Sequence, residues 1–298
     1  MKKISIILLT IVFLLLSTAV ALADAKWQFS IEDLTLSGNL DNFLYWGNTD
    51  SSQVISKVSM PQNQNMIILS GTYNMPNNGF IKLQYGDTGA EIKGRGSDSD
   101  WTNYGSDTIT YYGNMDCYGY QRLYDIDFET TLKKTNTQKI TMFLGWGKQV
   151  STNEFKNIIY HLDDGVDVGN ATQADNGTSL NAYFSGIRLG VSDDIIINSK
   201  FGLDFDFIYS FVNAEVDGHW ANYTPAHDWV SKGTGYGYTT DIDFKYLFNE
   251  HLTARIGYRY NYVEIDNCDL IMNGDYYDQV EDYKYKLSGL NFGIIYKF

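Results

Sequence analysis

Two short stretches of the sequence each carry a pair of ionisable side chains two residues apart. Asp98 and Asp100 lie in the stretch 94–101, and Asp217 and His219 lie in the stretch 215–220. Side chains at positions i and i+2 of an extended chain point the same way, so each pair can present both of its groups to one cavity. An aspartate pair that faces an Asp/His pair can activate a water molecule, which makes a hydrolytic site the first hypothesis.

The elements that would position these pairs are strands with one apolar and one polar face. Apolar side chains occupy every second position from 290 to 298, with small or polar side chains between most of them, and the same alternation recurs at 120–132, 236–248 and 252–262. This period of two is typical of a strand whose two faces meet different surroundings.

The number and spacing of such stretches decide between a soluble sandwich and a membrane barrel. Their connections alternate strictly between short and long, which is the layout of an outer-membrane barrel. The 24 Tyr and 16 Phe fit aromatic girdles at the two membrane interfaces. The sequence therefore predicts an all-β fold, a ten-stranded antiparallel transmembrane β-barrel with long extracellular loops. The predicted strands are 31–46, 54–75, 79–95, 118–133, 138–152, 179–192, 195–216, 234–248, 251–265 and 283–298.

The predicted strands are long for a membrane protein. About 22 residues at ~3.3 Å each, tilted by ~45°, rise about 50 Å, whereas the apolar band of a membrane barrel is ~25 Å tall. We therefore expect the barrel to project far outside the cell. Ten strands also enclose too little space for a wide pore, which disfavours a general porin.

The N-terminal residues have the pattern of an export signal. Lys2 and Lys3 precede an apolar run at 4–16 that is too short to span a membrane, and Ala21-Leu22-Ala23 is a cleavage site. We predict a signal peptide at 1–23 and an outer-membrane barrel domain at 24–298. The net charge of -14 becomes -16 when the two lysines leave with the signal, which argues against nucleic acid and favours cationic partners.

With these features the chain resembles the omptins, ten-stranded outer-membrane proteases with an active site at the extracellular mouth. The stretch 96–101, Gly-Ser-Asp-Ser-Asp-Trp, resembles the family's loop motif with two catalytic aspartates, and 217–219 resembles its Asp-x-His motif. Less diagnostic likenesses are Leu-Ser-Gly at 36–38 and Tyr-Lys-Phe at 296–298. The resemblance implies a monomeric endopeptidase of the outer membrane that cleaves peptides or proteins.

The resemblance also implies the catalytic roles of the four residues. His219 would be the general base, because an imidazole titrates near neutrality, and Asp217 would orient its ring. Asp98 would hold the attacking water together with His219 across the cleft. Asp98 and Asp100 carry like charges, so they would titrate as a coupled pair and one could keep a proton to stabilise the developing oxyanion.

Specificity and lipid binding are where the chain departs from the family pattern. Omptins prefer basic residues beside the cut and use acidic pocket residues, and Glu215 matches one of these as a substrate-binding residue. The other, on the first strand, falls at Asn42. The resemblance allows lipopolysaccharide as an activator. Val150 stands where a lipid-binding arginine is expected, so the sequence does not support this role. No cofactor or metal is expected.

Other kinds of protein remain to be weighed. A Ser-His-Asp hydrolase is disfavoured because no G-x-S-x-G turn is present, and a zinc enzyme is disfavoured because no H-E-x-x-H is present. The alternative to the endopeptidase is a catalytically silent outer-membrane barrel that acts as an adhesin or a narrow channel. Cys117 and Cys268 fall in two predicted long loops, where their spacing leaves a disulfide open.

The active-site hypothesis conflicts with the alternation of the strand that carries it. In the predicted strand 195–216 the apolar, lipid-facing side chains occupy the odd positions from 201 to 211. Continued without interruption, that parity would aim Glu215, Asp217 and His219 out of the barrel. We therefore predict a register break between Val212 and Val216, either as a β-bulge or as a loop that turns the motif inward.

Overall fold

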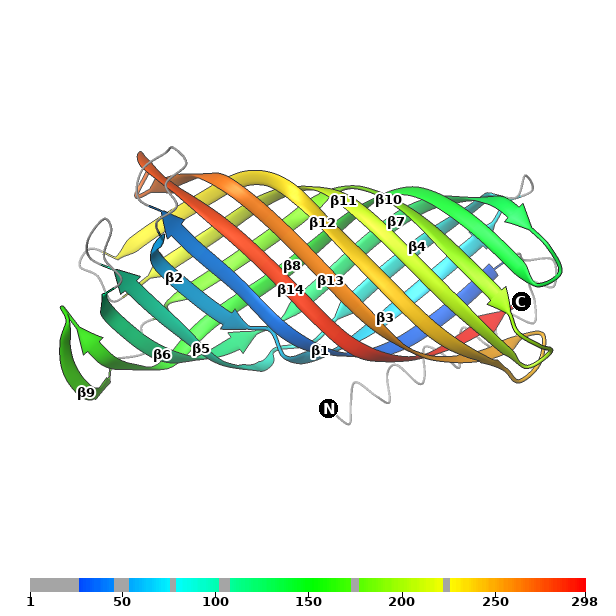
Figure 1. Ribbon diagram of the computed structural model, residues 1–298, viewed down its shortest axis with the longest axis horizontal. Coiled ribbons are helices and arrows are strands. Elements are labelled where there is room, and N and C mark those ends of the chain that lie inside the picture. The colour runs from blue at the N-terminus through cyan, green and yellow to red at the C-terminus, as the bar shows by residue number, and fades with distance from the viewer. Residues whose placement is uncertain (1–26, 46–53, 76–78, 102–107, 173–176, 222–225) are drawn as a thin grey trace.

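The computed structural model describes residues 27–45, 54–75, 79–101, 108–172, 177–221 and 226–298. The predicted signal peptide, at 1–23, lies outside these residues. The described chain is all-β, as predicted, and the strands wind around a common axis (Figure 1). They are β1 Trp27–Tyr45, β2 Val54–Pro61, β3 Gln64–Asn74, β4 Gly79–Asp87, β5 Glu91–Trp101, β6 Ile109–Gly119, β7 Gln121–Lys134, β8 Gln138–Asp163, β9 Val166–Thr172, β10 Ser179–Ile196, β11 Phe201–Trp220, β12 His227–Leu247, β13 Leu252–Met272 and β14 Asp275–Lys297.

All strand pairs are antiparallel, and their pairing returns on itself. Strands β10 to β14 pair in chain order, β14 pairs with β1, and β10 also pairs with β8. Between β1 and β8 the sheet follows two routes, β2–β5–β6 and β3–β4–β7. Each route covers one half of the barrel wall, because β1 pairs with β3 at 27–36 and with β2 at 39–45.

Three of the predicted strands, 54–75, 79–95 and 118–133, are therefore each divided into two strands at the level where the two routes meet. Lys93 is buried at this level and its ammonium lies within hydrogen-bonding distance of the side chains of Gln62 and Ser151, at 2.9 and 3.0 Å. It also reaches the carbonyls of Tyr120 and Thr152, at 3.3 and 2.8 Å. Where a strand is interrupted, its backbone carbonyls lose their partners in the sheet and need other hydrogen-bond donors, such as this ammonium.

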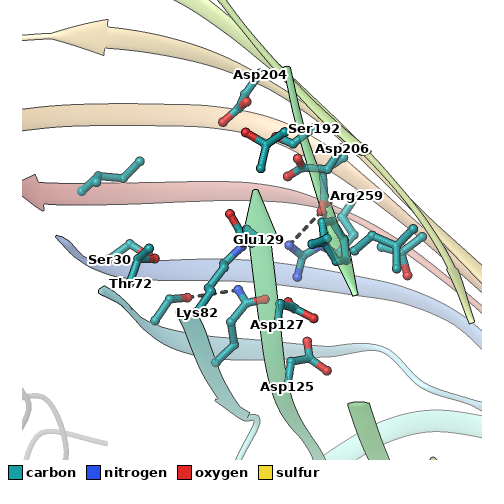
Figure 2. A pocket seen from close by; sticks show the side chains of 18 of the residues that line it. Ser30, Thr72, Lys82, Asp125, Asp127, Glu129, Ser192, Asp204, Asp206 and Arg259 are labelled. Carbon is teal, nitrogen blue, oxygen red and sulfur yellow. Dashed lines mark hydrogen bonds and ion pairs between the residues drawn. The ribbon is translucent and has the colours of Figure 1, made fainter. Parts of the chain in front are cut away.

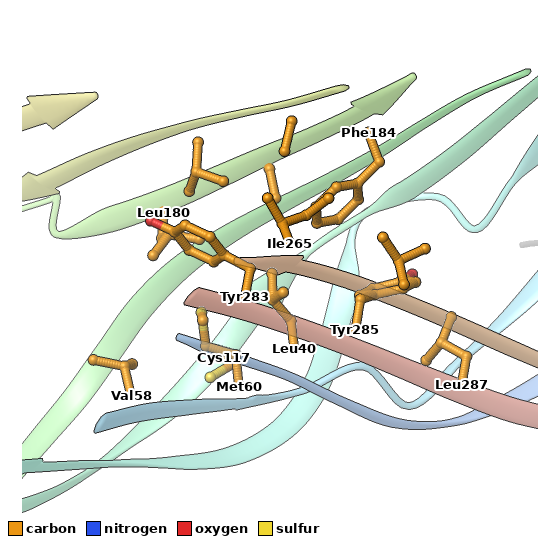
Figure 3. Close-up of a cluster of buried hydrophobic side chains, with 14 of the residues drawn as sticks. Leu40, Val58, Met60, Cys117, Leu180, Phe184, Ile265, Tyr283, Tyr285 and Leu287 are labelled. Carbon is orange, nitrogen blue, oxygen red and sulfur yellow. The ribbon is translucent and has the colours of Figure 1, made fainter. Parts of the chain in front are cut away.

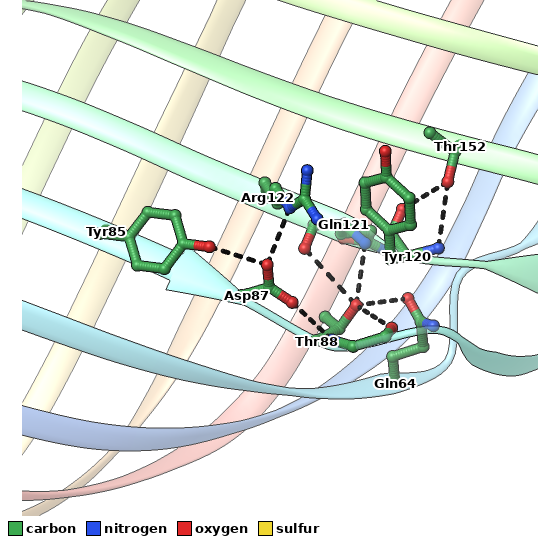
Figure 4. A network of polar contacts seen from close by, with 9 residues as sticks. Gln64, Tyr85, Asp87, Thr88, Tyr120, Gln121, Arg122 and Thr152 are labelled. Atoms are coloured by element: carbon green, nitrogen blue, oxygen red, sulfur yellow. Dashed lines mark hydrogen bonds and ion pairs between the residues drawn. The ribbon is translucent and has the colours of Figure 1, made fainter. Parts of the chain in front are cut away.

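A second set of contacts closes the interruption between β4 and β5 (Figure 4). The Thr88 hydroxyl accepts a hydrogen bond from the Gln121 backbone N–H at 2.8 Å. Next to it, the Asp87 carboxylate accepts from Arg122 and from the Tyr85 hydroxyl, both at 2.8 Å. Polar side chains thus replace the ladder bonds that the strands give up at the bend.

One end of the barrel has short turns, at 135–137, 197–200 and 248–251, and is here called the short-turn end. At the opposite, hairpin end the prediction of long loops is wrong. Within 95–118, 152–179, 217–233 and 265–283, the residues that the structure describes are mostly strand. Strands β13 and β14 meet in a turn at Asn273 and Gly274, which have φ angles of 51° and 92°. Positive φ at both central positions is typical of a tight hairpin turn.

The outside of the short-turn half is apolar. Leu83, Phe128 and Leu144 point outward and are each more than half exposed, and many other large apolar side chains join them there. A surface of this kind suits lipid and not water. None of the described residues forms a helix long and apolar enough to cross a membrane.

The inside of the hairpin half is filled by apolar side chains (Figure 3). Leu40, Met60, Leu180 and Ile265 are fully buried there, and Tyr283 packs among them. Cys117 and Cys268 belong to the same cluster as free thiols, on β6 and β13 and not in loops as predicted. This core stabilises the wall of the hairpin half and fills the interior at this level.

Candidate active site

The first predicted pair, Asp98 and Asp100, lies on β5 and faces the interior. A β-bulge between Ile92 and Gly94 shifts the register of β5 against β6. Gly94 has a φ of 141°, which favours glycine, and a Cβ there would lie 3.0 Å from Pro61. Beyond the bulge, Asp98 stands directly opposite Val58 of β2, which is buried in the core. The bulge therefore aims both aspartates inward.

Burial dominates the electrostatics of this pair. It raises the pKa of Asp98 well above its usual range, and the neighbouring Asp100 carboxylate raises the pKa of Asp98 further. Burial also raises the pKa of Asp100, against a hydrogen bond from Ser56 that lowers it. Among the described residues, none donates a hydrogen bond to Oδ1 of Asp98. The pair therefore holds a proton at a pH where an exposed aspartate is ionised.

The second predicted pair, Asp217 and His219, lies on β11 and faces outward. Pairing of β11 with β10 and with β12 keeps one register from Gly202 to His219. Val212, Ala214 and Val216 are buried in the core, so the odd-numbered positions that alternate with them, from 213 to 219, face outside. The predicted register break between Val212 and Val216 is wrong, and Glu215, which forms an ion pair with Lys232 at 3.1 Å, also points out.

Side-chain packing explains why the strand keeps this register. Gly218 faces inward against the buried Trp229, and a Cβ on Gly218 would lie 2.0 Å from the Trp229 ring. Trp220 stacks on the same ring with centroids 5.5 Å apart, and on Phe155 at 5.8 Å. Turning His219 inward would turn Gly218 and Trp220 outward, and Trp220 would then lose its packing against Trp229 and Phe155.

The partner of the His219 ring is Asp228 and not Asp217. Asp228 stands directly opposite His219 on β12, and its carboxylate lies 2.5 Å from Nδ1 of the ring. Asp217 lies beside Glu215 on the outer face, where partial burial and the Glu215 charge raise the pKa of Asp217. Sequence reasoning missed Asp228 because the pairing of β11 with β12 depends on the length of the turn between them.

The structure therefore does not bring the four predicted residues into one cavity. Along the pairing order, β5 and β11 are separated by four steps in one direction and six in the other, so they form opposite walls. Asp98 points into the barrel from one wall, and His219 points away from it on the other. A water molecule that touches one of these side chains is out of reach of the other.

A buried acid that sequence reasoning missed lies near Asn42. Asn42 is buried on β1 directly opposite Tyr283 of β14. The carboxylate of Glu281, two residues away, accepts hydrogen bonds from the Tyr283 hydroxyl at 2.5 Å and from Ser231. Burial raises the pKa of Glu281, and these hydroxyl donors oppose that rise. A buried carboxylate therefore lies on β14, the strand that pairs with β1 at Asn42.

Two further expectations concern metal-ligating side chains and the basic side chain expected at position 150. Within the described ranges, no group of three or more His, Cys, Asp or Glu side chains is arranged to hold a metal ion. Val150 of β8 lies directly opposite Arg122 of β7, whose guanidinium sits over the Tyr120 ring at 4.2 Å from its centroid. A basic side chain therefore lies on the strand next to position 150, where it forms an ion pair with Asp87.

Comparison with known proteins reveals a likeness in fold. No protein-family model matches the sequence, and no curated protein matches it. The outer-membrane protease OmpT from Escherichia coli superposes with a TM-score of 0.82 at 16% identity, covering 92% of this chain and 97% of that protein. The shared property is the fold.

Two further solved structures give weaker likenesses. The translocator domain of autotransporter NalP from Neisseria meningitidis gives a TM-score of 0.38 at 7% identity, with 92% of this chain and 88% of that one covered. Neisserial surface protein A gives 0.27 at 10% identity, with 91% and 97% covered. Scores this low carry no argument about function.

Proposed function

We propose that this protein is a monomeric barrel of the outer membrane that binds cationic polypeptides at the cell surface and holds them without cutting them. In this proposal the hairpin end lies outside the cell and the apolar belt contacts lipid. The observation that supports binding without cleavage is that Asp98 points into the barrel and His219 points out of it. A general base must lie within hydrogen-bonding reach of the water that it activates, and here the wall separates the two.

The preference for cationic partners rests on charge. The chain has no Lys or Arg between 157 and 187, whereas Asp163, Asp164 and Asp167 are exposed on the hairpin of β8 and β9. Exposed charge of one sign attracts the opposite sign over about one Debye length, ~8 Å at physiological salt. Binding should therefore weaken as salt is added.

The second candidate is an endopeptidase of omptin type that cleaves near basic residues. It is favoured by the fold shared with an outer-membrane protease and by the inward aspartate pair with its raised pKa. In this candidate Asp98, Asp100, Asp217 and His219 are catalytic and Glu215 binds substrate. It requires the end of β11 to turn over, so that the His219 ring enters the interior.

One experiment separates the two candidates. Refolded protein is mixed with fluorescent cationic and acidic peptides, with and without lipopolysaccharide, and binding is followed by anisotropy while mass spectrometry reads any cuts. We expect saturable, salt-sensitive binding of intact cationic peptides. Cleavage that disappears in both Asp98→Ala and His219→Ala, but not in the outer-face control Asn213→Ala, would establish the endopeptidase instead. Equal binding of acidic peptides would contradict the charge argument.

A further inference from the structure

The interior of the short-turn half contains a cavity of about 620 Å³. It extends from Trp27, Lys297 and Phe298 at the short-turn end to the apolar side chains of Leu36 and Leu287 at the level of the core. The core therefore closes its inner end, so a ligand would enter from the short-turn end. A volume of this size suits a small molecule.

Most charges on the cavity wall are already paired. The Arg188 guanidinium lies 2.5 Å from the Asp125 carboxylate and 3.1 Å from that of Asp127. On the opposite wall, Arg259 forms an ion pair with Asp241 at 2.6 Å. These side chains hold one another in place, which makes the wall rigid and leaves few groups free to bind a ligand.

Two opposite charges in the cavity are not held in this way. Lys82 of β4 and Glu129 of β7 both line the cavity (Figure 2). Across the part of the chain that the structure describes, neither side chain forms a hydrogen bond or an ion pair within 4.0 Å. Glu129 and Asp206 are the two carboxylates that act most strongly on the Lys82 ammonium. The interior thus offers an unpaired cation and an unpaired carboxylate, and near them Asp206, whose carboxylate already accepts a hydrogen bond from Ser192.

The rim of the cavity at the short-turn end is cationic. Lys134, Lys139 and Lys297 line it, and the Lys139 ammonium sits over the Phe80 ring, 3.9 Å from its centroid. A purely cationic ligand would be repelled at this rim, and a purely anionic one would meet the excess of carboxylates deeper inside. A molecule that carries both charges satisfies both regions.

We propose that this cavity binds a small zwitterion, such as a free amino acid or a dipeptide, from the short-turn side. Its ammonium contacts Glu129 and Asp206, and its carboxylate contacts Lys82. Away from bulk water, charge–charge attraction is stronger than at an exposed surface, although stripping water from both ends of the ligand opposes binding. The proposal is independent of the proposed surface function, because it concerns the other half of the barrel.

The test uses refolded full-length protein in detergent and three related probes. Calorimetry measures the binding of glycylglycine, of its N-acetylated form, which lacks the ammonium, and of its C-terminal amide, which lacks the carboxylate. We expect saturable binding of glycylglycine and at least a tenfold loss of affinity for each blocked form. Because these ligands are compared on the unaltered protein, the result does not depend on the folding of any variant.

Variants then locate the site. Lys82→Met and Glu129→Gln should each weaken the binding of glycylglycine at least tenfold, whereas Lys286→Met, on the outer surface, should leave it unchanged. The proposal is overturned if glycylglycine shows no saturable binding, if the amide binds as well as the zwitterion, or if Lys82→Met binds like the parent protein with an unchanged melting temperature.

Discussion

The hairpin ends of β5 and β11 each carry a pair of ionisable side chains two residues apart, but the two pairs point in opposite directions, one into the barrel and one out of it. On β5 a bulge at Gly94 precedes the motif, and Asp98 points into the barrel. On β11 the alternation is unbroken, and His219 points out of it. One residue of register moves a whole motif from the inner to the outer face, because the side-chain period of a strand is two.

The comparison also shows what holds each register in place. On β5 the bulge depends on a glycine with positive φ, whereas on β11 the register depends on Gly218, Trp220 and Trp229 packing inside. Residue types and spacing alone therefore do not establish a catalytic group. The packing of the residues between them decides where the ionisable side chains point.

The largest expected effect is at Gly218. Gly218→Ala places a methyl group against the Trp229 ring, and overpacking of this kind costs about 2 to 3 kcal/mol of unfolding free energy. Denaturant unfolding in detergent measures this cost. Asn213→Ala, on the outer face of the same strand, is the control and should change the unfolding free energy little. If Gly218→Ala were as stable as the parent, Gly218 would not face inward.

A smaller effect concerns pH and the inward pair. Because the folded-state pKa of Asp98 and of Asp100 lies above that of the unfolded chain, folding favours the protonated form. This contribution to stability is complete below the usual aspartate range and is lost as the pH rises through the folded-state pKa, at about 1.4 kcal/mol for each unit of pKa difference. Unfolding followed from pH 4 upward should show the loss, and Asp98→Asn should reduce it. A stability that rises over the same interval would contradict the inward, buried placement of the pair.

The alternation of the sequence was sufficient for much of the fold. It predicted the strands at 234–248 and 283–298, and within the alternation at 120–132 the polar positions 125 and 127 are the ones whose side chains are buried. It could not predict the interruptions near Lys93, because these depend on hydrogen bonds between segments far apart in the chain.

The candidate site was harder to predict than the fold. The residue types at 98, 100, 217 and 219 were recognisable, but their directions depend on a single bulged residue that is present in β5 and absent from β11. Asp228 could not be paired with His219 without knowing the turn that joins β11 to β12. Glu281 was missed because two of its partners, Ser231 and Asn42, come from other strands, β12 and β1.

The smallest expected effect is at the pair of His219 and Asp228. The Asp228 carboxylate is 70% exposed, so the contact resembles a surface ion pair, which contributes less than about 1 kcal/mol. Asp228→Ala should therefore lower the unfolding free energy only slightly. A loss as large as that of Gly218→Ala would mean that the pair is buried and that the outer face of β11 has been misassigned.

The most direct test of the opposite placement is the reactivity of single cysteines toward a membrane-impermeant maleimide. His219→Cys and Asp98→Cys are each made in a background in which the two buried native thiols, Cys117 and Cys268, are replaced by alanine. We expect the thiol at position 219 to react like an exposed one and the thiol at position 98 to react at least tenfold more slowly, because burial both blocks access and disfavours the thiolate. A fast reaction at position 98 together with protection at position 219, or equal rates at both, would contradict the account.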